Sequence, residues 1–267
     1  MSCIAVIPAR YASTRFCGKP LANQTGKYLI QHVYEQAAKA SSIDDVIVAT
    51  DDRRIVEAVE SFGGRSVMTR NDHPSGTDRV AEVAAGLDCE IVLNVQGDEP
   101  EIEPEALDRL VALIRQSEHP MATLACSFDA LRTQGIEADP SDPNCVKVVC
   151  DKGRAIYFSR SVVPYEREAH AAYQGPWLHL GTYAYRREFL LKLASLEPTT
   201  LERVEALEQL RVLGHGYSIA VQVVERAALG IDTPADYAAF VKRYEEEERH
   251  GGTEARRGIE GRRDEET

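Results

Sequence analysis

The sequence contains no apolar run near 18 residues, and no basic segment followed by an apolar signal core. These absences predict no membrane span and no secretion signal, so that a cytoplasmic location is the default expectation. The six cysteines are scattered without a CxxC pair, which argues against a disulfide framework or a zinc site. Positive charge is also scarce, because 31 Lys and Arg stand against 43 Asp and Glu, for a formal net charge of -12. This acidity argues against nonspecific binding to nucleic acid or to an anionic membrane.

What the sequence does contain is typical of an ordinary soluble globular protein. Of its 267 residues, 43% are hydrophobic and 28% are charged. A chain of this length buries enough surface for a self-sufficient core.

One short stretch runs against the acidic balance. The segment IPARYASTRFCGKP, residues 7–20, follows a short apolar run and carries three cations: Arg10, Arg15 and Lys19. Backbone amides and these side chains could jointly hold a chain of phosphates. The segment is not a P-loop, since the pattern GxxxxGK[ST] is absent. A solvated charged loop is the alternative, but prolines at both edges limit its freedom and favour a preformed anion site.

Short apolar segments alternate with amphipathic ones through the first 120 residues. The expected strands are 3–9, 44–52, 65–69 and 90–100, and the expected helices are 28–40, 53–64, 76–87 and 104–117. This alternation predicts an α/β fold with an open, mostly parallel sheet flanked by helices. Ligands of such sheets bind beyond the carboxyl ends of the strands. The cationic loop and the turn QGDEP both fall there.

Beyond residue 120 the alternation is less regular. We expect two strands with a turn in 144–164, a strand and then a helix in 177–196, a helix at 201–216, a strand at 217–225 and a helix at 233–250. Strands without intervening helices suggest an inserted β-rich layer that could serve dimerisation. The last residues, 251–267, have almost no apolar side chains and are predicted to be a disordered tail. We therefore expect a single domain over 1–250.

Two aspartates are candidate metal ligands. Asp98 in QGDEP comes just past a buried strand, and Asp232 lies in GIDTP in the other half of the chain. Mg²⁺ is typically held by one or two carboxylates plus substrate phosphates, so this pair would suit it. The alternatives are an ordinary turn aspartate for Asp98 and helix capping for Asp232.

Several polar residues are flanked by apolar ones and need partners if they are buried. They are Arg160, His179, Glu208 and Gln209. A polyhydroxylated acid would supply such partners, and an arginine could bind its carboxylate. A satisfied core histidine and a solvated helix face remain open as alternatives for His179 and Glu208.

Read together, the motifs resemble those of one enzyme family. IPARYASTRFCGKPL, ATDD, HPSGTDRVAEV, LNVQGDEP, VKVV, YFSRSVVPY, HLGTYAYRREFL, LEQLRVL and GIDTPADY occur in that order over residues 3–243. The series is similar to that of 3-deoxy-manno-octulosonate cytidylyltransferases, also called CMP-KDO synthetases. The resemblance implies the reaction of CTP with the eight-carbon acid sugar KDO, giving CMP-KDO and diphosphate with Mg²⁺ as cofactor. It also implies a nucleotide-diphospho-sugar-transferase-like (Rossmann-like) fold, a homodimer, and a role in lipopolysaccharide synthesis.

The resemblance further implies roles for individual residues. Arg10, Arg15 and Lys19 match the triphosphate loop, Ser75, Gly76 and Thr77 match a nucleotide-contacting segment, and Asp98 and Asp232 match the metal ligands. Gln96, Arg160, His179, Tyr183, Glu208 and Gln209 match positions associated with the sugar. Residues 1–120 would then be mainly nucleotide-binding, and 121–225 mainly sugar-binding and dimerisation. One departure is Cys17 in FCGKP, where the family usually has LPGKP; it frees one backbone amide and loosens the turn.

The implied mechanism is a phosphoryl-type transfer that depends on positioning and charge neutralisation. Asp98 and Asp232 would hold Mg²⁺ between the attacking sugar hydroxyl and the α-phosphate, while Arg15 and Lys19 would stabilise the leaving diphosphate. No side chain is an obvious general base, so that task would fall to the metal. Two alternatives stay open: a noncatalytic nucleotide-binding protein of the same fold, and a cytidylyltransferase for another acid sugar, such as 8-amino KDO or a sialic acid.

Overall fold

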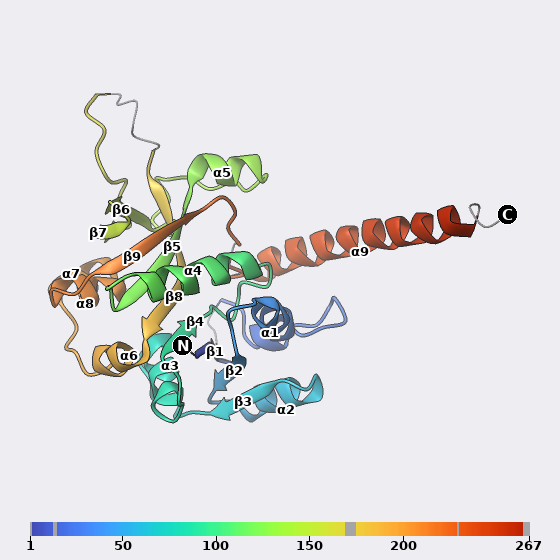
Figure 1. Cartoon of the computed structure of the whole chain (residues 1–267), viewed down its shortest axis with the longest axis horizontal. Helices are drawn as coiled ribbons and strands as arrows, with labels where there is room; N and C mark the ends of the chain where they lie inside the picture. The colour runs from blue at the N-terminus through green and yellow to red at the C-terminus, as the bar shows by residue number, and fades with distance from the viewer. Residues whose placement is uncertain (1, 13–14, 169–174, 229, 264–267) are drawn as a thin grey trace.

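One sheet with helices on both faces organises the chain (Figure 1). The structure is a computed structural model that describes residues 2–12, 15–168, 175–228 and 230–263. The strands of the described residues are β1 (Cys3–Ala9), β2 (Asp45–Thr50), β3 (Arg65–Met68), β4 (Ile91–Asn94), β5 (Met121–Ser127), β6 (Lys147–Asp151), β7 (Arg154–Ser159), β8 (Trp177–Arg186) and β9 (Ile219–Val224). Their order across the sheet is β3-β2-β1-β4-β8-β5-β9-β7-β6.

The helices include a short 3₁₀ turn, η1 (Lys19–Leu21), after the first strand. The α-helices are α1 (Leu29–Lys39), α2 (Arg53–Ser61), α3 (Gly76–Ala85), α4 (Pro104–Gln116), α5 (Phe128–Thr133), α6 (Arg187–Leu193), α7 (Thr200–Glu205), α8 (Gln209–Gly214) and α9 (Pro234–Arg263). The predicted α/β sheet flanked by helices is confirmed.

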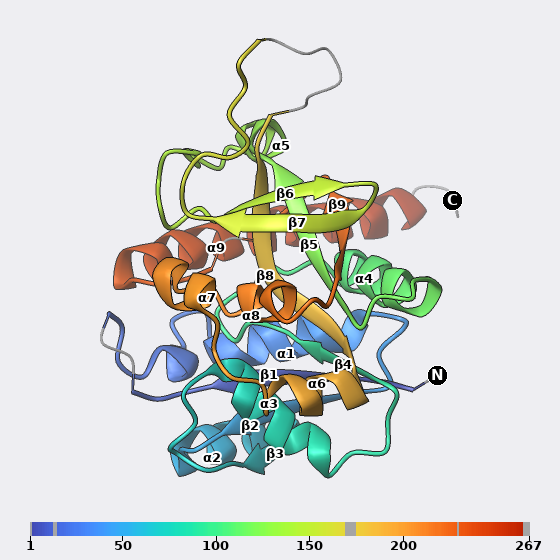
Figure 2. The same ribbon diagram turned by 90° about the vertical axis from the view of Figure 1, so that its left-hand side faces the viewer.

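The alternation of side chains along the strands builds two cores. Ala5 and Ile7 of β1 pack with residues of α1, α2, α4 and α5, whereas Val6 points to the other face and packs with α3, α6 and α8. This is the period-two pattern expected of a strand buried on both faces. Figure 2 faces the side that α3, α6 and α8 cover.

The sheet is more mixed than the sequence predicts. β8 lies between β4 and β5 and is antiparallel to both, and β7 is antiparallel to β6 and β9. The remaining strands run in one direction. β5 and α5 were not predicted, because the regular alternation of strand and helix patterns ends near residue 120. The predicted hairpin is present as β6 and β7, across one end of the sheet (Figure 2).

Two helix predictions need correction. The segment expected as one helix over 201–216 is divided into α7 and α8, because Ala206 adopts the left-handed conformation, with φ 53. In addition, α9 continues to Arg263, although 251–267 was predicted to be disordered. Ion pairs one turn apart, such as Arg249–Glu245 at 3.1 Å, support the helix before this segment, whereas four glycines within 251–263 oppose helix formation there. The end of α9 projects from the body of the molecule (Figure 1).

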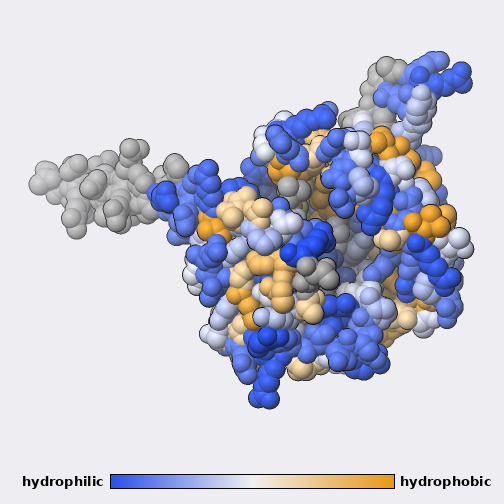
Figure 3. Space-filling view, turned by 180° about the vertical axis from the view of Figure 1, so that it is seen from behind, coloured by the Kyte–Doolittle hydropathy of each residue, from blue (hydrophilic) through white to orange (hydrophobic). Residues whose placement is uncertain are grey.

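The surface is largely polar. Hydrophilic residues predominate on the face shown in Figure 3, with smaller hydrophobic areas among them. In the described part of the chain, no helix has both the length and the apolar character needed to cross a membrane.

Candidate active site

The cationic loop is fixed by a tight backbone closure. The amide of Gly18 donates to the carbonyl of Tyr11 over 2.9 Å, and Gly18 has a φ of 71, which favours glycine. A Cβ at Gly18 would also lie 3.2 Å from the Tyr11 ring. Lys19 follows directly as the first residue of η1, so this turn determines where its side chain begins. Two residues of the cationic loop, Ser13 and Thr14, lie outside the described residues.

The two predicted metal aspartates meet at this loop. Lys19 Nζ lies 2.7 Å from Asp98 Oδ2 and 3.9 Å from Asp232 Oδ1, and Arg15 Nη1 lies 2.9 Å from Asp232 Oδ2. The amide of Ile231 donates to the carbonyl of Asp98 over 2.9 Å and thereby joins the two aspartate segments. The structure therefore brings together three segments that are far apart in the sequence: the cationic loop, the turn of Asp98 and the loop of Asp232.

Backbone packing explains how Asp98 reaches this position. It lies in a turn beyond the end of β4. A Cβ at the preceding residue, Gly97, would come within 2.8 Å of the carbonyl oxygen of Pro8, so only glycine allows the turn to approach β1. Asp232 lies in the loop just before α9.

The chemistry of these carboxylates fits a hard divalent cation. The ammonium of Lys19 already lies between Asp98 and Asp232, which shows that the two converge on one positive charge. Among the described residues, no group of three or more His, Cys, Asp or Glu could hold a metal ion. Glu99 does not add to the pair: its carboxylate accepts from Thr182, and burial, followed by the charge of Asp98, raises its pKa to about 8. A metal bound by two carboxylates would need further oxygen ligands from a substrate or water, as is usual for Mg²⁺.

Arg10 joins the loop to the start of α3. Its Nη2 donates to the carbonyl of His73 over 2.8 Å. Ser75 caps α3 by accepting from the amide of Asp78, as the sequence predicts for Ser75 or Thr77. The predicted nucleotide-contacting segment, residues 75–77, thus lies at a helix N-terminus, where anions are stabilised.

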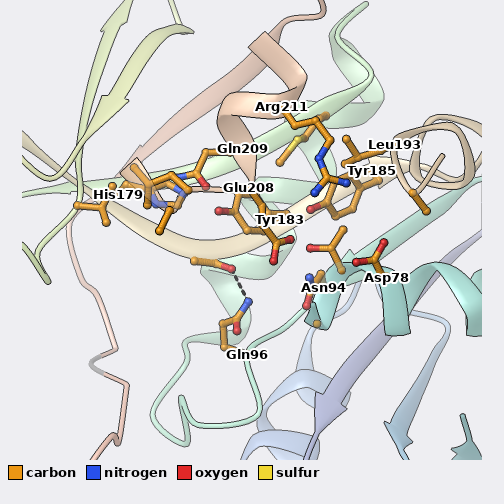
Figure 4. A pocket seen from close by; sticks show the side chains of 18 residues that line it. Asp78, Asn94, Gln96, His179, Tyr183, Tyr185, Leu193, Glu208, Gln209 and Arg211 are labelled. Atoms are coloured by element: carbon orange, nitrogen blue, oxygen red, sulfur yellow. Dashed lines mark hydrogen bonds between the residues drawn. The ribbon is translucent and has the colours of Figure 1, made fainter. Parts of the chain in front are cut away.

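A cavity of about 340 Å³ lies at the N-terminal turn of α3 (Figure 4), and its lining includes none of Arg10, Arg15, Lys19, Asp98 and Asp232. Its walls come from β4, β8, the N-terminal turn of α3, and the segment between α7 and α8. Of the predicted sugar residues, five line it: Gln96, His179, Tyr183, Glu208 and Gln209. Gly76 and Thr77 also line it. Its size and its mixture of aromatic and polar walls suit a small polyhydroxylated ligand.

The aromatic end of the cavity holds His179 in its neutral form. The His179 ring lies 4.9 Å from that of Phe158 and 5.4 Å from that of Tyr183, centroid to centroid. Burial lowers the pKa of His179 to about 3, and burial likewise raises the pKa of Tyr183. Neutral groups of this kind can exchange hydrogen bonds with sugar hydroxyls but add no charge.

Glu208 reaches the cavity because α8 begins after the break at Ala206. Glu208 is an exposed residue that lines the cavity, and desolvation by the cavity walls raises its pKa. Hydrogen bonds from Thr77 and Ser75 oppose this shift. The contact of Glu208 with Thr77 and Ser75 joins the predicted nucleotide-contacting segment to the predicted sugar pocket.

The chain is similar to known cytidylyltransferases over nearly its whole length. A family profile described as cytidylyltransferase matches residues 4–219. The 3-deoxy-manno-octulosonate cytidylyltransferase of Syntrophotalea carbinolica is 50% identical, over 88% of this chain and 96% of that protein. The enzyme of the same name from Geotalea daltonii is 49% identical, over 91% of this chain and 98% of that protein. This chain belongs to the 3-deoxy-manno-octulosonate cytidylyltransferase family.

A solved structure described as CMP:2-keto-3-deoxy-manno-octonic acid synthetase in complex with CTP has a TM-score of 0.85. It is 41% identical and covers 92% of this chain and 100% of its own. The 4-diphosphocytidyl-2C-methyl-D-erythritol synthase of Anaerococcus prevotii, at 15% identity and a TM-score of 0.58, shares the fold.

Arg160 is the one predicted sugar residue that does not line the cavity of this family member. Its guanidinium donates to the carbonyl oxygens of Glu205 (2.7 Å), Pro143 (2.9 Å) and Ala206 (3.3 Å). Its backbone amide donates to the Glu205 carboxylate over 2.9 Å. Arg160 thus fixes the turn that leads into Glu208.

Among the lining residues that were not predicted, four have polar side chains: Asp78, Asn94, Tyr185 and Arg211. Arg211 is bound through two nitrogens to the carboxylate of Glu202, and the two side chains are only 13% and 9% exposed. Tyr185 is almost completely buried, with 1% of its surface exposed. The YAY spacing of Tyr183 and Tyr185 on β8 was the available signal, because residues two apart face the same side of a strand.

Proposed function

We propose that this protein transfers a cytidylyl group from CTP to KDO, giving CMP-KDO and diphosphate for lipopolysaccharide biosynthesis. One observation carries the proposal: a polar cavity of sugar size lies close to the cationic loop and the two converging aspartates. Gln96, which lines the cavity, is two residues from Asp98. A reacting hydroxyl in the cavity and a triphosphate at the loop would meet near that aspartate.

In the proposed reaction the anomeric hydroxyl of the sugar attacks the α-phosphorus of CTP. A new oxygen–phosphorus bond forms, the bond to the diphosphate breaks, and the hydroxyl proton passes to solvent water. Arg10, Arg15 and Lys19 would bind the triphosphate, and Arg15 and Lys19 would stabilise the leaving diphosphate by charge. Residues 75–77 would contact the nucleotide through the helix N-terminus and the capping serine.

Asp98 and Asp232 are the residues that would hold Mg²⁺. Bound there, the metal would neutralise phosphate charge and lower the pKa of the sugar hydroxyl.

The cavity residues would orient the acid sugar. Glu208 and the side-chain oxygens of Gln96 and Gln209 can accept hydrogen bonds from hydroxyl groups, and the neutral His179 can donate or accept. Gln96 is itself held, since its Nε2 donates to the carbonyl of Gly181 over 2.7 Å. Such preorganisation fixes the sugar relative to the α-phosphorus.

We also propose that the active form is a homodimer. The support is an exposed apolar surface on and after the β6–β7 hairpin, formed by Ile156, Val162 and Tyr165, which are 52%, 50% and 88% exposed. Exposed apolar groups of this size are typical of protein–protein contacts. Sedimentation equilibrium checks the proposal, because a monomer at micromolar concentration would contradict it.

The function is tested by diphosphate release with CTP and a panel of acid sugars. We expect release with KDO and Mg²⁺, and much less with a sialic acid or with other nucleoside triphosphates. A preference for 8-amino KDO would retain the reaction type but change the substrate. No release with any acid sugar would favour a noncatalytic nucleotide-binding role.

A further inference from the structure

The two aspartates proposed to hold the metal are already paired with cations of the chain. Lys19 contacts Asp98 at 2.7 Å and Asp232 at 3.9 Å, and Arg15 contacts Asp232 at 2.9 Å. The same two cations are proposed to bind the triphosphate. Their positive charge is shared between the carboxylates and the proposed phosphates, so binding of the nucleotide and binding of the metal are expected to be coupled.

The position of Lys19 is built by several elements. Its side chain is only 14% exposed, and its Nζ also donates to the carbonyl of Ile231 over 2.7 Å. The carbonyl comes from the loop before α9, and Asp98 comes from the turn after β4. An ammonium in this position has the partners that a small bound cation would have.

We propose that Lys19 is a placeholder for the metal: in the free enzyme it occupies the carboxylate pair, and it leaves when the triphosphate arrives. A divalent ion alone would have to displace the ammonium and would then lie beside two cations without phosphate. The triphosphate gives Lys19 and Arg15 new partners and frees Asp98 and Asp232. The free enzyme would therefore bind the metal weakly, and the metal and nucleotide would each tighten binding of the other. This inference rests on the proposed function.

The test measures metal binding without turnover. Mn²⁺ replaces Mg²⁺ as a paramagnetic probe, and free Mn²⁺ is followed by electron paramagnetic resonance in the absence of nucleotide and sugar. We expect weak binding to the wild type and binding roughly tenfold to hundredfold tighter in Lys19→Met, which keeps the length of the side chain and removes the charge. Adding Asp98→Asn to Lys19→Met should abolish this gain.

Arg10→Met is the matched control. Arg10 belongs to the same loop and has the same charge, but it contacts the carbonyl of His73 and not the aspartates. If lost positive charge in the region were the whole cause, Arg10→Met would raise Mn²⁺ affinity as much as Lys19→Met. That result would overturn the proposal, and so would tight Mn²⁺ binding by the nucleotide-free wild type.

A second measurement addresses coupling and folding. Inorganic diphosphate or CTP should tighten Mn²⁺ binding to the wild type many-fold and to Lys19→Met much less. Arg15→Met, at a side chain that is 63% exposed, should fold normally and give a smaller gain in the same direction. Equal tightening in the wild type and Lys19→Met would refute the placeholder role. Failure of the proposed sugar chemistry is distinguishable, because it would appear only in the diphosphate-release assay.

Discussion

Replacing Arg160 by lysine separates a structural role of this residue from a role in sugar binding. The guanidinium reaches three carbonyl oxygens, at Glu205, Pro143 and Ala206, between 2.7 and 3.3 Å. A lysine keeps the charge but cannot present donors to all three. The turn that it fixes is followed by Glu208, which lines the cavity.

The magnitude follows from the bonds that are lost. Loss of two hydrogen bonds at a half-buried site should lower the free energy of unfolding by about 1–3 kcal/mol. For a chain of this size that corresponds to a melting temperature lower by roughly 3–8 °C. Displacement of the turn should lower kcat/KM for the acid sugar about tenfold to hundredfold, with KM for CTP nearly unchanged.

Steady-state kinetics for each substrate and a melting curve test this expectation together. Arg132→Lys is the control, because Arg132 is 61% exposed and pairs only locally, with Asp129. A lower melting temperature with unchanged constants for both substrates would refute the reasoning, since Arg160 would then act on the fold alone. A loss that affects CTP as strongly as the sugar would also contradict it.

Three further predictions concern other parts of the chain. Asp98→Asn should nearly abolish turnover while the circular dichroism spectrum is preserved, and a folded, fully active variant would end its assignment as a metal ligand. Deletion of 251–267 should leave activity and melting temperature nearly unchanged, because this end of α9 projects from the body; a drop of several degrees would show that it docks. His179, whose pKa is lowered to about 3 from 6.5 by burial, should show no imidazole titration by NMR between pH 8 and 5. An NMR titration midpoint near 6.5 would contradict burial of the ring. Because the folded pKa of His179 is below its unfolded pKa, its contribution to the free energy of unfolding should be lost as the pH falls from about 6.5 towards 3.

Local patterns in the sequence were sufficient to predict most of the strands and helices in residues 1–120. The alternation that gives β1, α1, β2, α2 and β3 is strong, because each strand is a short apolar run and each helix has one apolar face. The rule that ligands bind at the carboxyl ends of strands then placed the cationic loop and Asp98 near each other. The family resemblance favoured the metal role of Asp232 and the sugar roles over their alternatives, and it added Gln96 and Tyr183.

The remaining features depend on contacts between distant segments. No local signal puts β8 between β4 and β5, because its neighbours are chosen by packing of the whole sheet. The division of the predicted helix at Ala206 is similar, since alanine has the highest helix propensity and yet adopts a positive φ there. The bonds of Arg160 to Glu205 and Ala206 support this turn, and they could not be inferred from the sequence order.

The cationic loop shows why residue roles inferred from a resemblance are incomplete without geometry. The sequence assigns Lys19 and Arg15 to the phosphates and Asp98 and Asp232 to the metal, as if the two pairs were separate. In the structure these two cations and two anions neutralise one another directly. A metal alone would leave this cluster with excess positive charge, and a triphosphate alone would lie close to two carboxylates. Bound together, the metal and the triphosphate offset part of each other's charge, and an acidic protein can therefore place its phosphate-binding cations beside its metal-binding aspartates.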